Sequence, residues 1–216
     1  MRRAGWVAAG AAVVLAAVGG VTVALADGPV ASAPAAKSKV PTDGSADAGF
    51  ARDMAVHHQQ AVEMSFVIRD RTDDPGIRRL AYDIANTQAN QRGMLLGWLD
   101  LWGLPYASSD APMAWMKHGG DGGHSGHQVK DGALMPGMAT KTEMARLAKA
   151  NGKQAEILFL QLMTDHHKGG VTMAQGCVDQ CSVGTERKLA QGMVDAQESE
   201  LKLMADLLKE RDAKPR

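Results

Sequence analysis

The chain has 216 residues, which is enough for one domain of ordinary size or two very small ones. Lys plus Arg and Asp plus Glu both number 24, so no basic excess exists and a dedicated nucleic-acid binder is disfavoured. Aromatic residues make up only 4%, whereas Met numbers 13 and His 7. The two cysteines cannot form a disulfide-dense scaffold or a four-thiolate zinc site. A Met-rich, His-bearing helical protein remains.

Residues 1–26 resemble an export segment. Arg2 and Arg3 precede an uncharged apolar run from Trp6 to Ala26, which ends in a small-x-small cleavage signal. A run of about 20 apolar residues can also span a bilayer. Two interpretations therefore stay open, a cleaved signal peptide and an N-terminal membrane anchor. Both predict an extracytoplasmic protein, either secreted or tethered to the outer face of the cytoplasmic membrane by this segment alone. Residues 27–45 are interpreted as a flexible linker.

The remainder of the chain contains an internal repeat with an offset of 109 residues. The motif F-x3-M-x2-H-H-x5-M starts at Phe50 and again at Phe159, and Leu80 and Gln88 match Leu189 and Gln197 at the same offset. Because one offset holds without a gap over some 40 residues, we interpret the chain as a duplication.

Each half is predicted to be a helical hairpin. Apolar spacing and end signals predict helices over residues 48–69, 76–102, 152–177 and 185–210, with a short helix opened by a capping box at Thr140 and Glu143. The expected fold is an all-α four-helix bundle over residues 46–212. Its halves span about 46–104 and 140–212, and a connection rich in Met, His and Gly (105–139) joins them.

In each predicted hairpin, the core-facing stripe of the first helix carries imidazoles between thioethers. Thioether sulfur is a good ligand for Cu(I), and imidazole serves both oxidation states of copper. The sequence therefore predicts copper ligands at Met54, His57, His58, Met64, Met163, His166, His167 and Met173. Side chains that would fix the histidine tautomers are Gln88, Gln91, Gln197 and Glu200. The alternative is that Met fills gaps in an aromatic-poor core while His and Gln hydrogen-bond inside it.

The connection offers a second, weaker metal site in a Gly-rich and flexible setting. Its candidate ligands are Met113, Met116, His118, His124, His127, Met135 and Met138. The alternative is a flexible linker in which these residues are incidental. Cys177 and Cys181 could be copper thiolates, but in an oxidising compartment a disulfide is favoured. Such a bridge requires the helix to fray or end between them.

These motifs resemble a bacterial secreted family catalogued as domain of unknown function 305. The resemblance rests on the doubled F-x3-M-x2-H-H-x5-M motif and on L-A-x2-I-x3-Q followed by W-L-x2-W-G, and it covers about residues 45–212. It implies a ferritin-like four-helix bundle and, for some members, copper or silver binding linked to metal tolerance. It also implies the same eight Met and His ligands. Gln91 and Arg92 depart from the usual Glu and aliphatic residue.

Three functional hypotheses follow. The first is a non-catalytic extracytoplasmic protein that binds copper, and silver as its analogue, for sequestration, delivery or tolerance. The second is a metal-free structural or interaction protein of the envelope. The third, a ferritin-like dinuclear-metal oxidase, is disfavoured because such centres use Glu-x-x-His motifs and no Glu precedes a His by three residues here.

Overall fold

The computed structural model describes residues 40–116 and 129–216. The predicted export segment, most of the predicted linker, and His118, His124 and His127 lie outside the described residues. The described part belongs to one compact unit that spans Lys39–Arg216. None of the helices in this part is both long and apolar enough to span a bilayer.

Five helices make up the described structure. They are α1 (Ala46–Arg69), α2 (Pro75–Trp102), α3 (Lys141–Lys149), α4 (Gly152–Gln180) and α5 (Gly184–Lys209). Across residues 40–116 and 129–216 no strand forms, and a lone bridge joins Lys130 to Ala133. The prediction of an all-helical bundle is thereby confirmed, and every helix lies within a few residues of its expected range.

Local end signals explain where the helices begin and stop. Ser45 and Asp74 each accept a hydrogen bond from a first-turn amide of α1 and α2, which is the preferred way to satisfy such amides. Gly103 ends α2 at φ 67°, a left-handed conformation that glycine adopts without strain. Thr140 and Glu143 form the predicted capping box of α3.

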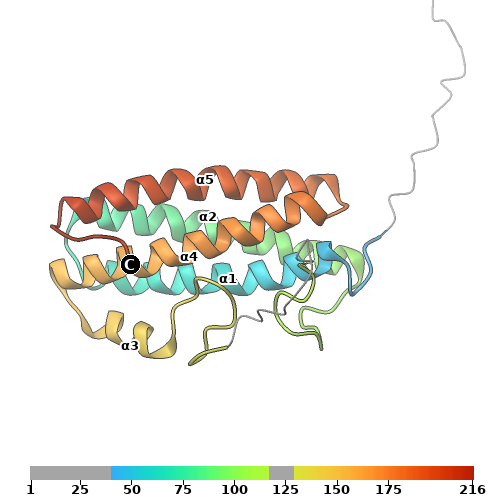
Figure 1. The fold of residues 1–216 in the computed structure, drawn as a ribbon, viewed down its shortest axis with the longest axis horizontal. Helices are drawn as coiled ribbons and strands as arrows, with labels where there is room; N and C mark the ends of the chain where they lie inside the picture. The colour runs from blue at the N-terminus through green and yellow to red at the C-terminus, as the bar shows by residue number, and fades with distance from the viewer. Residues whose placement is uncertain (1–39, 117–128) are drawn as a thin grey trace, which may run out of the picture. The chain divides into compact units, whose positions relative to one another are not determined.

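The two repeats pack as hairpins around a central helix pair (Figure 1). Helix α1 packs on α2, α4 packs on α5, and the hairpins meet through α1 and α4. The start of α1 lies against the end of α4, because Asp47 binds Ser182, and Gly152 at the start of α4 binds Arg71 after α1. The central helices therefore run antiparallel, and buried apolar residues form one cluster toward each end of the bundle.

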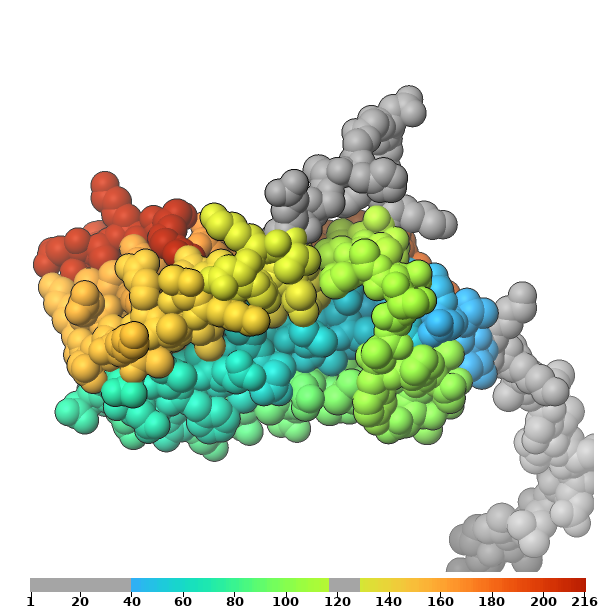
Figure 2. Space-filling model, turned by 90° about the horizontal axis from the view of Figure 1, so that it is seen from below, coloured from blue at the N-terminus to red at the C-terminus, as the bar shows by residue number. Residues whose placement is uncertain are grey.

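Both described ends of the connection pack on the bundle, which corrects the expectation of a flexible setting throughout. Residues 105–116 and 129–140 cover one face of the molecule beside α1 (Figure 2). Met113, Met116 and Met138 pack against the apolar cluster at the start of α1, and Met135 is 1% exposed within it. Glycine permits this close packing, because a Cβ on Gly137 would lie only 2.3 Å from the Asp165 carbonyl oxygen.

Candidate metal centre

Four histidines form a buried layer at the contact between α1 and α4. His57 and His58 come from α1 and His166 and His167 from α4, and all four are 0% exposed. The rings of His57 and His166 lie against each other with centroids 3.8 Å apart. The structure thus brings together the two His pairs that the repeat predicted as ligands.

Hydrogen bonds decide which nitrogen of each ring carries the proton. Nε2 of His166 donates to the His57 carbonyl oxygen at 2.9 Å, and Nε2 of His57 donates to the Pro136 carbonyl oxygen at 3.3 Å. Nε2 of His167 lies 2.7 Å from the Glu200 carboxylate. A neutral imidazole that donates through Nε2 keeps the lone pair on Nδ1. None of these three Nδ1 atoms has a hydrogen-bond partner, and neither does the Nδ1 atom of His58, so each of the four buried rings has an unpartnered Nδ1.

The environment keeps the imidazoles of His57, His58 and His166 neutral. Burial, together with the neighbouring imidazoles, holds the pKa of His57 and of His166 well below 6.5. Burial and the adjacent His57 lower the pKa of His58 to about 3, although the Gln91 side chain partly offsets them. Because metals bind the neutral form of imidazole, these three rings can coordinate at neutral pH without losing protons.

The predicted thioethers flank the layer in two pairs, and each pair takes one residue from each repeat. Met54 and Met173 lie in the apolar cluster at the start of α1, whereas Met64 and Met163 lie in the cluster at the other end. All four are 0% exposed. This crossed pairing follows from the antiparallel arrangement of α1 and α4.

The donor set of the layer suits a soft cation. Among residues 40–116 and 129–216, the histidines do not converge as three nitrogen or carboxylate ligands within 4.8 Å of one another. The other soft donors on the same two helices are the four buried thioethers of the flanking clusters. Cu(I) and its analogue Ag(I) accept both imidazole nitrogen and thioether sulfur, whereas Mg²⁺ and Ca²⁺ require oxygen.

The four residues predicted to support the histidines differ in what they contact. Glu200 binds His167 directly, and Gln91, its counterpart in the first repeat, faces His58. The Gln197 side chain packs against Gly170, where a Cβ on the glycine would lie 2.4 Å from Oε1 of Gln197. Gln88 is buried, and neither polar atom of its side chain has a hydrogen-bond partner. A carboxylate therefore reaches the layer only from the second repeat in the described residues.

The described loop methionines pack on the apolar cluster at the start of α1, and the second predicted metal site stays a prediction because its histidines lie outside the described residues. The Met135–Ala139 segment, here called the strap, crosses the histidine layer, because Pro136 binds His57 and Ala139 exchanges two hydrogen bonds with the Gln60 side chain. His166 Nε2 donates to the His57 carbonyl oxygen, so repeat symmetry would have His57 Nε2 donate to the His166 carbonyl oxygen. The strap occupies that position instead.

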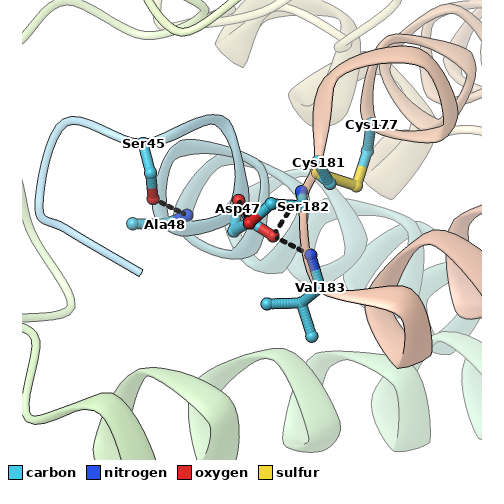
Figure 3. The surroundings of a disulfide bond; sticks show 7 residues. All are labelled: Ser45, Asp47, Ala48, Cys177, Cys181, Ser182 and Val183. Atoms are coloured by element: carbon cyan, nitrogen blue, oxygen red, sulfur yellow. Dashed lines mark hydrogen bonds between the residues drawn. A yellow bond between two sulfur atoms is a disulfide. The ribbon is translucent and has the colours of Figure 1, made fainter. Parts of the chain in front are cut away.

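A second polar cluster surrounds the two cysteines at the end of α4. Cys177 and Cys181 are joined by a disulfide, and α4 ends at Gln180, between them. Asp47 accepts hydrogen bonds from the amides of Ser182 and Val183 beside this bridge (Figure 3). Glu186, buried next to the bridge, was missed by sequence reasoning. The repeat could have revealed it, because Glu186 corresponds to Ile77 at the offset of 109, so an acid stands where the first repeat has a buried aliphatic residue.

The sequence profile of the domain of unknown function DUF305 matches residues 47–208. This chain belongs to the DUF305 family. A DUF305 protein from Streptomyces coelicolor that is assigned as secreted has 63% identity, and the match covers 81% of this chain and 99% of that one with a TM-score of 0.72. No curated protein matches significantly.

More distant solved structures share the fold. A DUF305 fragment from Deinococcus radiodurans is 28% identical, with a TM-score of 0.62 over 76% of this chain and 96% of that one. The protein CopM in its Cu(I)-bound form is 20% identical, with a TM-score of 0.57 over 76% of this chain and 96% of that one. CopM is also known in Cu(II)-bound and Ag-bound forms. At this identity the likeness to CopM shows a common fold.

Proposed function

We propose that this DUF305 protein is a non-catalytic, extracytoplasmic copper-binding protein that holds the metal for sequestration, delivery or tolerance. The observation that carries the proposal is the set of four buried Nδ1 atoms without hydrogen-bond partners, one on each histidine of the layer, between two pairs of buried thioethers. A buried polar atom without a partner destabilises a fold by about 1–3 kcal/mol, so retaining four in one layer is costly unless a ligand uses them. The copper-bound and silver-bound forms of CopM lend support from a shared fold.

The extracytoplasmic part of the proposal has two supports. The N-terminal sequence has the pattern of an export segment. The Streptomyces coelicolor relative is assigned as secreted. Whether the segment remains as a membrane tether is decided by the N-terminal sequence of the protein recovered from the cell envelope.

The test replaces thioethers without changing core volume. Met54→Leu with Met173→Leu removes one crossed pair, and Leu for Met is a swap that usually changes stability by less than about 1.5 kcal/mol. We expect Cu(I) affinity, measured by competition with a chromophoric chelator, to fall at least about tenfold, which corresponds to about 1.4 kcal/mol. Native mass spectrometry reports the stoichiometry.

Met193→Leu is the matched control. Met193 is buried in the same apolar cluster, but it lies on α5 and its repeat counterpart is Ile84, outside the predicted ligand set. Equal Cu(I) affinity in the double variant and the control would show that these methionines are core residues and not copper ligands. If His57→Ala with His166→Ala also left copper uptake unchanged, the metal-free structural function would take the place of this proposal.

A further inference from the structure

The disulfide region holds a set of ligand atoms separate from the histidine layer. Among the described residues, the one group of three His, Cys or carboxylate ligand atoms within 4.8 Å of one another is Cys177, Cys181 and Glu186. Cys177 and Glu186 are fully buried and Cys181 is 3% exposed. The group lies where the end of α4 meets the start of α5.

The repeat shows that the fold does not need these residue types. With the offset of 109, Cys177, Cys181 and Glu186 correspond to Ile68, Thr72 and Ile77. Ile68 and Ile77 are fully buried and Thr72 is 6% exposed, so the first repeat builds the same corner from ordinary core residues. The second repeat has therefore gained two sulfurs and a carboxyl group at positions where packing alone is sufficient.

Glu186 is buried with the Asp47 carboxyl group as its neighbour, and no ion pair with a cation forms among the described residues. Neither of its oxygens accepts a hydrogen bond from a protein donor. Burial, the nearby Asp47 charge and a side-chain hydrogen bond with Asp47, which the protonated form of Glu186 would donate, raise the pKa of Glu186 to about 9. Asp47 itself is satisfied by Ser182 and Val183, whereas its repeat counterpart Glu156 pairs with Arg211. The Glu186 carboxyl group is thus held beside the sulfurs without a cation to balance its ionised form.

We propose that reduction of the Cys177–Cys181 disulfide creates a site for a divalent d10 cation of the Zn²⁺ class, with Glu186 as third ligand. A phosphine breaks the S–S bond, takes the oxygen of one water molecule to become the phosphine oxide, and the two hydrogens of that water end on the two sulfurs as thiols. A dithiol gives the same product by transferring its own two hydrogens and closing to a disulfide. The cation then replaces two thiol protons and the carboxyl proton. Two thiolates and a carboxylate are ligands typical of Zn²⁺.

Charge favours the divalent ion over the copper cargo. Three anionic ligands leave a net charge of −1 around Zn²⁺ or Cd²⁺ and −2 around Cu(I), and a buried excess charge is strongly unfavourable. The site is therefore expected to differ from the histidine layer both in metal preference and in its dependence on redox state. The inference does not rest on the proposed copper function, since copper binding by the disulfide form reports on the histidine layer alone.

The experiment compares the full chain before and after reduction by a water-soluble phosphine. Each form is titrated with Cd²⁺, and the thiolate-to-cadmium charge-transfer band in the ultraviolet and the native mass are recorded. We expect the reduced form to bind one additional Cd²⁺ with the band, and the disulfide form to show no band. Glu186→Gln should weaken this binding at least about tenfold, or about 1.4 kcal/mol. Glu198→Gln, an exposed acid on the same helix, should leave it unchanged.

Other outcomes would overturn the inference. A reduced protein without the band shows that the sulfurs do not bind the cation, and an unweakened Glu186→Gln variant shows that the carboxyl group is no ligand. Circular dichroism follows folding, and loss of helicity on reduction that Cd²⁺ does not restore counts equally against the site. Cys177→Ile with Cys181→Thr, the residues of the first repeat, should fold and show no band.

Discussion

Burial disfavours the protonated, charged form of the histidines in the layer, because that form loses its hydration there. His57, His58 and His166 are fully buried among apolar side chains, and each ring carries a pKa lowered by that burial. In the unfolded chain the same rings would take up protons near pH 6.5. The difference makes folding itself sensitive to acid, because the unfolded state binds more protons below that pH.

The free energy of unfolding should therefore fall as the pH drops below about 6.5, since the folded-state pKa of these rings is depressed. Each histidine contributes up to about 1.4 kcal/mol per pH unit. Urea unfolding at pH 7.5, 6 and 5 measures the slope, and His58→Gln should reduce it by up to about one histidine's share. A stability that does not change between pH 7 and pH 5 would contradict neutral burial of the rings.

At the scale of elements, the strap decides how His57 is held. It can lie close to α4 only because both backbones lack a side chain at the contact, where a Cβ on Gly169 would stand 2.0 Å from the Pro136 carbonyl oxygen. That carbonyl is the one that accepts the His57 proton. A glycine on α4 thus fixes the tautomer of a histidine on α1 through an intervening loop.

Gly169→Ala should displace the strap and destabilise the protein by about 1–3 kcal/mol, the usual effect of overpacking. The amide proton of Ala139, which donates to Gln60, should exchange faster with solvent in the variant. Gly93→Ala on α2, where a Cβ meets nothing within 4 Å, is the control and should stabilise by up to about 1 kcal/mol through helix propensity. Similar effects of the two substitutions would show that the strap does not depend on close contact.

Over the whole molecule, the duplication places an acid at the start of each central helix, and each acid holds the turn between the helices of the other repeat. Asp47 binds the turn before α5, and Glu156 accepts hydrogen bonds from Thr72 in the turn before α2 and from Arg211. The two acids differ in neighbours, because Glu156 is next to a cation and Asp47 is next to another acid.

Neutralising these acids should therefore have unequal effects. Glu156→Gln leaves the buried Arg211 without its closest partner and should destabilise by about 3 kcal/mol. Asp47→Asn keeps an acceptor for the amides and relieves the repulsion of Glu186, so it should destabilise by only about 1 kcal/mol. Urea denaturation measures both, with the exposed Glu63→Gln as reference. A larger effect for Asp47→Asn would contradict this ranking.

Sequence reasoning could reach the helices and the ligand types but not their pairing. The repeat predicted two His pairs and four thioethers because each stripe is local to one helix. Which methionines share an end of the layer depends on the antiparallel crossing of α1 and α4, a tertiary feature. The hydrogen bond from His57 to Pro136 joins residues 79 apart and depends on the close approach of the strap to Gly169. No periodicity in the sequence predicts such a contact.

The crossed thioether pairs also bear on how such a molecule could have arisen. A single hairpin supplies only one methionine to each pair and one half of the stacked imidazoles, so it cannot build the layer alone. Two identical hairpins docked about a two-fold axis would supply every member, because that axis exchanges Met54 with Met163 and Met64 with Met173. Gene fusion would then have freed the joining segment to differ from its surroundings, and the strap is one place where the present chain departs from the symmetry of such a dimer.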